Sequence, residues 1–243
     1  MTIARSLSLT VSALVLAAAS GSALAQMAAA PMGGMAASPM GMAPAAERHL
    51  IQVTVENLTT GQNFSPGFFV SHAASRAPIF ELGATASEPL WSVAEGGNIG
   101  QFSSGAAGAL ASGEIGDAIV PVHTPPGATR TFYLTVDEAH PLLSGVWMLG
   151  MTNDGFGGLA GYDAFGLRGS VTLDIMGYDA GSEKNNEARG FLGALGGGNT
   201  RDPENGVIAI HAGIRGDKDA PAAWNFDPQL VARVTLSPVD VGA

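Results

Sequence analysis

The chain has 243 residues, with 34 glycines and no cysteine, and its formal net charge at pH 7 is −10. The lack of cysteine excludes disulfides, thiolate metal sites and a cysteine nucleophile. The excess of acidic residues repels phosphate backbones, so we expect no nucleic-acid binding, whereas cations are attracted. Lysine occurs only at Lys184 and Lys218, and such a glycine-rich, lysine-poor composition is typical of a loop-rich β protein.

Residues 1–25 are predicted to be a secretory signal peptide. Arg5 supplies the positive region, residues 7–19 form an apolar run, and Ala23-Leu24-Ala25 ahead of Gln26 has the small-x-small form of a signal-peptidase site. This apolar run is too short to span a bilayer, which needs about 20 residues. We therefore expect an exported protein, periplasmic or secreted, that has no transmembrane segment and is not a lipoprotein.

Residues 26–46 are predicted to be a disordered linker rich in Met, Ala, Gly and Pro, because this uncharged segment cannot form a packed core. It holds more than half of the nine methionines of the chain: Met27, Met32, Met35, Met40 and Met42. Thioether sulfur is a soft ligand that selects Cu(I). A periplasmic copper-handling protein is therefore an alternative to the function developed below.

Residues 47–243 are predicted to be one β-rich domain. Apolar and polar residues alternate most clearly at 50–58 and 129–136, as in half-buried strands, and a continuous apolar run at 142–151 indicates a strand covered on both faces. Further strands are expected at 68–72, 115–122, 169–175, 207–211 and 230–236, short helices at 88–95 and 99–111, and loops at 155–169 and 184–206. This pattern predicts an all-β fold, an antiparallel β-sandwich with one or two short helical crossings.

Two acidic loops that follow apolar strands are the candidate metal site. Asp154 lies in the first loop, and Asp179 and Glu183 lie in the second. Glycines at 155 and 181 let the backbone turn sharply, so that carboxylates and carbonyls can converge on one ion. Such oxygens are the ligands that Ca²⁺ prefers. Further candidate ligands are Asn153, Asn186 and Glu187.

The motifs in these loops resemble the spondin N-terminal domain family, particularly its bacterial exported members. The resemblance rests on YDAGSE at 178–183, TNDGF at 152–156, and VTVENLT at 53–59 with FSP at 64–66. It implies a β-sandwich with one calcium ion bound by Asp154, Asp179 and Glu183, and the F-spondin-like animal members are extracellular matrix proteins. Animal members have an aromatic residue at the place of Gly155 and an aspartate at the place of Glu183, whose carboxylate can also bind Ca²⁺ in bidentate fashion.

No catalytic motif accompanies these loops. Ser71 and His72 could serve a hydrolase, yet the chain lacks a Gly-x-Ser-x-Gly elbow, a His-Glu-x-x-His helix and a phosphate-binding loop, and His72 at the end of an apolar strand is typical of a hydrogen-bonded structural residue. We therefore predict a non-enzymatic calcium-binding module that serves binding, adhesion or surface interaction. Its partner, a protein, a glycan or a cell surface, leaves no linear motif.

Overall fold

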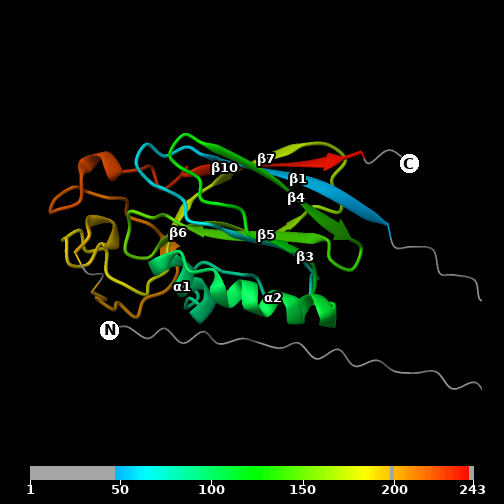
Figure 1. Ribbon diagram of the computed structural model, residues 1–243, viewed down its shortest axis with the longest axis horizontal. Coiled ribbons are helices and arrows are strands. Elements are labelled where there is room, and N and C mark those ends of the chain that lie inside the picture. The colour runs from blue at the N-terminus through cyan, green and yellow to red at the C-terminus, as the bar shows by residue number, and fades with distance from the viewer. Residues whose placement is uncertain (1–46, 198–199, 241–243) are drawn as a thin grey trace, which may run out of the picture. The chain divides into compact units, whose positions relative to one another are not determined.

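The computed structural model describes residues 47–197 and 200–240. The predicted signal peptide, the linker at 26–46 and its copper-binding methionines lie outside the described residues. Two antiparallel sheets and two helices make up the regular structure, so the predicted all-β fold with short helical crossings is confirmed (Figure 1). No helix in the described ranges is long and apolar enough to cross a membrane.

The first sheet has four strands in the order β4-β1-β10-β7. Its strands are β1 (Arg48–Asn57), β4 (Thr129–Asp137), β7 (Val171–Ile175) and β10 (Ala232–Val239). β1 lies in the middle and pairs along its length with β4 and β10, with Val53 opposite both Phe132 and Leu236. This register places the apolar positions of all three strands on one face, as the alternation in their sequences requires.

The second sheet has six strands in the order β3-β2-β5-β6-β8-β9. Its strands are β2 (Phe68–His72), β3 (Ile115–Ile119), β5 (Leu142–Met148), β6 (Gly155–Asp163), β8 (Gly177–Asp179) and β9 (Ala209–Ile210). The helices are α1 (Glu88–Gly96) and α2 (Gly100–Ser112), and two 3₁₀ turns cover Gly193–Leu195 and Ala222–Trp224.

The core has two layers. The larger layer fills the space between the sheets, where Val53 and Leu134 of the first sheet and Phe69 and Trp147 of the second belong to one buried cluster. The smaller layer lies between the second sheet and the helices, which cover the outer face of that sheet (Figure 1). β2 therefore turns alternate side chains into both layers, which explains why all five of its residues are buried.

The loop expected at 155–169 was wrong in its first half, because residues 155–163 form β6. The glycines that suggested a loop are needed for close packing within the sheet. A Cβ atom at Gly157 would lie 2.7 Å from the indole of Trp147, and one at Gly158 would lie 2.7 Å from the ring of Phe80. Glycine here lets aromatic rings lie flat on the strand, a role that composition alone does not reveal.

Two strands are shorter than the sequence pattern predicted. The run expected at 142–151 ends at Met148, and the strand expected at 207–211 shrinks to Ala209–Ile210. The first helix agrees with expectation: Pro89 lies in its first turn, and Gly97 ends it with φ 63°.

Candidate metal centre

The pairing of β6 with β8 brings the two acidic loops together. Gly155 lies opposite Asp179 in this antiparallel pair, so Asp154 at the start of β6 is next to the end of β8. The backbone N–H of Ala180 donates to the carbonyl of Asp154 at 3.1 Å. The sheet thus places Asp154 and Asp179 on neighbouring strand ends, 25 positions apart in sequence.

Asp154 is completely buried, and only one of its two carboxylate oxygens accepts hydrogen bonds. Its Oδ2 accepts hydrogen bonds from the backbone N–H of Ser182 (2.8 Å), the hydroxyl of Ser182 (3.1 Å) and the backbone N–H of Glu183 (2.9 Å). Its Oδ1 is buried and has no hydrogen-bond partner. Burial, and after it the negative charge of Asp179, raises the pKa of the Asp154 carboxyl to about 7.

Asp179 organises the turn that follows β8. Its Oδ1 accepts from the backbone N–H of Gly181 at 2.7 Å, and its Oδ2 accepts from the side-chain amide of Asn185. Gly181 has φ 67°, and a Cβ atom there would lie 2.6 Å from the backbone nitrogen of Val207. Glycine is therefore required at this position both by the left-handed backbone and by the space.

Glu183 is turned toward a cation of the protein itself. Its Oε1 accepts from Nε of Arg201 at 3.1 Å, and the same guanidinium also pairs with Glu95 and lies over the ring of Trp91, 5.2 Å from its centroid. Burial and the charge of Glu95 raise the pKa of the Glu183 carboxyl, against the influence of Arg201. The carboxylate of Glu183 thus already has a counter-charge.

Calcium binding by the three predicted ligands stays a prediction. Across residues 47–197 and 200–240, no group of three or more His, Asp or Glu side chains is arranged to hold a metal ion. The structure brings together the carboxylates of Asp154 and Asp179, and it places the backbone of Glu183 against Asp154 while the carboxylate of Glu183 binds Arg201.

The further candidates have structural partners. Glu187 is buried, and its two oxygens accept backbone N–H groups from Arg215 at 2.6 Å and Gly216 at 2.7 Å. The amide of Asn153 donates to the carbonyl of Phe191 at 3.2 Å. Asn186 donates to Asp202 at 3.3 Å. These residues shape the segment 184–219 around the two acidic loops.

His211 belongs to the same neighbourhood, although the sequence pattern indicated only a strand residue. Its Nδ1 accepts from the backbone N–H of Gly213 at 2.8 Å, so the neutral ring carries its proton on Nε2, which is buried without a partner. Burial lowers the pKa of His211 to about 4, against the opposing charges of Asp179 and Glu187. A Cβ atom at Gly155 would lie 3.1 Å from Cδ2 of this ring, which places His211 beside the first loop.

No protein-family model matches the chain, and no curated protein matches it.

Proposed function

We propose that this protein is an exported, non-enzymatic calcium-binding β-sandwich of the spondin N-terminal type that its loop motifs resemble. In this proposal Ca²⁺ joins the loop before β6 to the loop after β8. The strongest support is a single atom, Oδ1 of Asp154, which is fully buried, accepts no hydrogen bond and lies near a second buried carboxylate, that of Asp179. Buried polar atoms without partners are rare and call for an explanation.

Two other buried carboxylates of the described residues have a basic partner: Glu183 is bound by Arg201, and Asp137 accepts from the ring of His140. Glu187 instead accepts backbone N–H groups on both of its oxygens, whereas Oδ1 of Asp154 accepts none. Neither Asp154 nor Asp179 makes an ion pair with any basic residue in the ranges that the structure describes. A bound cation would supply the counter-charge that both lack.

The chemistry of the available atoms suits a hard cation. Oδ1 of Asp154 and the carboxylate of Asp179 are oxygen donors, and Glu183 becomes a third when Arg201 releases it. Calcium accepts six to eight such oxygens, from carboxylates, carbonyls and water, in a flexible geometry. The acidic chain, with its net charge of −10, attracts cations in general.

The role proposed for the ion is to cross-link two loops. Asp154 already holds the second loop through the N–H groups of Ser182 and Glu183. Calcium coordinated by carboxylates of both loops would connect them more strongly than these hydrogen bonds do. The surface that the two loops form would then keep one conformation. That surface is the part of the module proposed to meet a protein, a glycan or a cell surface.

Calorimetric titration of the purified exported protein with Ca²⁺ tests the proposal. We expect one site per chain, lost in Asp154→Asn and in Asp179→Asn. Asp174→Asn is the matched control, because Asp174 is an exposed carboxylate on β7 that pairs with Arg233. Absence of binding at millimolar Ca²⁺, or equal binding by Asp154→Asn and wild type, would overturn the proposal. Titration of the same sample with Cu(I) addresses the alternative that rests on residues 26–46.

A further inference from the structure

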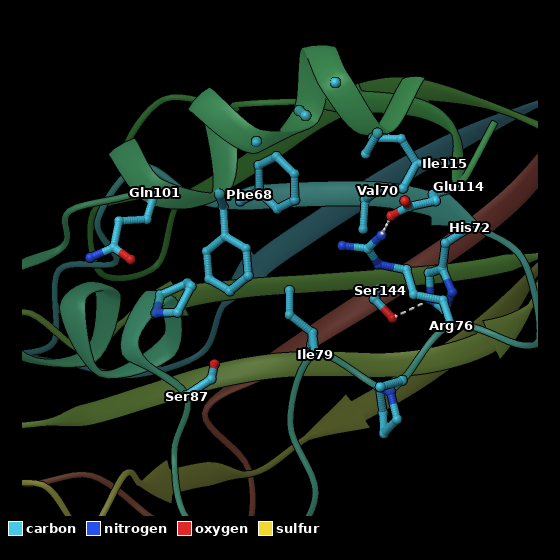
Figure 2. A pocket seen from close by; sticks show the side chains of 18 residues that line it. Phe68, Val70, His72, Arg76, Ile79, Ser87, Gln101, Glu114, Ile115 and Ser144 are labelled. Atoms are coloured by element: carbon cyan, nitrogen blue, oxygen red, sulfur yellow. Dashed lines mark hydrogen bonds and ion pairs between the residues drawn. The ribbon is translucent and has the colours of Figure 1, made fainter. Parts of the chain in front are cut away.

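A cavity of about 520 Å³ lies between α2 and the outer face of the second sheet. Its floor is formed by Phe68 and Val70 of β2, and its rim by the segment around Ile79 (Figure 2). Pockets that hold small molecules have volumes of about 300 to 1,000 Å³ and are lined mainly by apolar side chains with a few polar groups. The cavity shares no lining residue with the two acidic loops.

The cavity exists because α2 does not fill the space beneath it. None of the 13 residues of α2 is buried, although the helix lies over a sheet. Its side toward the cavity carries Gly105, Ala106, Gly108 and Ala109, and a Cβ atom at either glycine would meet no atom within 4 Å outside the helix backbone. The space beneath α2 is therefore accessible to a small molecule.

α2 packs against the core through Phe102, Ala106 and Ala109, which are only partly buried. Phe102 of α2 stacks on Phe68 of β2, with ring centroids 5.2 Å apart and planes inclined by 13°. By contrast, α1 packs Leu90 and Val93 fully into the same layer of the core.

One end of the cavity is polar. On one side of Phe68 in Figure 2 lie four polar residues, His72, Arg76, Glu114 and Ser144, and on the other side lies Gln101. His72 and Ser144 form a closed network: Gly161 N–H donates to the hydroxyl of Ser144 (2.8 Å), that hydroxyl donates to Nε2 of His72 (2.8 Å), and Nδ1–H of His72 donates to the carbonyl of Ala73 (3.0 Å). Burial lowers the pKa of His72, which keeps the ring uncharged at neutral pH.

Arg76 is a charged lining residue with hydrogen-bonding capacity left over. Its Nη1 donates to Oε2 of Glu114 at 2.9 Å, and this is its one side-chain hydrogen bond among the described residues. A guanidinium has five N–H donors in a planar fork that matches a carboxylate. Both members of the Arg76–Glu114 pair are partly exposed, so an incoming anion can reach the free edge of the guanidinium.

We propose that this cavity binds a small molecule with an apolar body and a carboxylate at one end. The apolar body lies against Phe68, Val70 and Ile79 beneath α2, and the carboxylate accepts hydrogen bonds from Arg76. The neutral network of His72 and Ser144 forms the uncharged wall beside it. This site is independent of the proposed calcium site, and either can fail without the other.

Titration of the full exported protein with decanoate, decan-1-ol and decylamine tests the ligand class. These probes share one apolar body and differ in the head group. We expect one saturable decanoate site per chain, with the alcohol and the amine bound about tenfold more weakly, because a charge-assisted hydrogen bond is lost. Arg76→Gln should reduce decanoate affinity to that of the alcohol, whereas Arg168→Gln, at an exposed arginine outside the cavity, should leave it unchanged.

Filling the cavity tests its location. Ala106→Leu places a larger side chain at a lining position, whereas Ala107→Leu makes the same change on the exposed side of the helix. We expect loss of decanoate binding in the first variant and full retention in the second. If Ala106→Leu does not fold, Gly105→Leu decides, since Gly105 lines the cavity and a Cβ atom there meets no atom within 4 Å. No binding of decanoate, equal binding of decylamine, or undiminished binding in the filled variant would each overturn the proposal.

Discussion

Replacing Asp154 by Asn should stabilise the metal-free protein while abolishing its response to calcium. The ordinary pKa of an aspartate is 3.8, and in the folded protein that of Asp154 is raised to about 7. At 1.36 kcal/mol per pKa unit, keeping this carboxylate ionised at pH 8 costs the folded state about 4 kcal/mol. Asn is close in shape, its carbonyl can accept from Ser182 and Glu183 as Oδ2 does, and it carries no charge.

The sign of the pH dependence follows from linkage. Between pH 3.8 and about 7 the folded state binds more protons at Asp154 than the unfolded state does, so wild-type stability falls as pH rises through this window. His211 acts in the opposite direction, because its lowered pKa of about 4 removes stability as pH falls below 6.5. The two effects offset each other in wild type, and the difference between wild type and Asp154→Asn isolates the aspartate.

Urea unfolding in EDTA at pH 5 and pH 8 measures this difference. We expect Asp154→Asn to be more stable than wild type at pH 8 by up to about 4 kcal/mol, which for a protein of this size is a rise in Tm of roughly 10 °C, and to gain less at pH 5. Adding Ca²⁺ should raise the stability of wild type, by about 2.7 kcal/mol at one hundred times Kd, and leave the variant unchanged. A variant less stable than wild type at pH 8 in EDTA would refute the reasoning, because Asp154 would then be a satisfied structural carboxylate.

Two further substitutions test the surroundings of the proposed site. Arg201→Gln removes the cation that binds Glu183, so we expect the Ca²⁺ affinity measured by calorimetry to rise several-fold. Lys184→Gln, which removes an exposed cation of the same loop, should change the affinity little. Weaker Ca²⁺ binding in Arg201→Gln would show that Glu183 is not a ligand. In Gly181→Ala the added Cβ would lie 2.6 Å from a backbone atom, and the residue would have to keep its left-handed conformation. We therefore expect the free energy of unfolding in urea to fall by at least about 2 kcal/mol. Gly190→Ala, where the added carbon meets no neighbouring atom, should change it little, and equal stabilities of the two variants would contradict the turn geometry.

The fold class could be predicted because it depends on local patterns. Alternation in β1 and β4 and the apolar run of β5 identify half-buried and fully buried strands before any partner strand is known. β6 could not be recognised in this way. Its glycines match the rings of Trp147 and Phe80, which come from other parts of the chain, so the reason for them appears only when those rings are in place.

The two acidic loops were also visible in the sequence, whereas the state of each carboxylate was not. Asp154, Asp179 and Glu183 look equivalent as acidic loop residues. In the structure one oxygen of Asp154 has no partner, Asp179 holds a turn, and Glu183 faces Arg201, 18 positions further along. The proximity of His211 depends on the pairing of β8 with β9, a contact that no spacing rule predicts.

The sequence by itself therefore determined the half-buried strands β1 and β4, the buried strand β5, the first helix and the acidic loops, since each depends on the side chains of neighbouring residues. Only the tertiary structure decided which carboxylate lacks a counter-charge and which face of α2 encloses a cavity. Both depend on burial and on atoms brought together from distant parts of the chain. Desolvation and packing are properties of the assembled sheets and helices, and a linear pattern does not contain them.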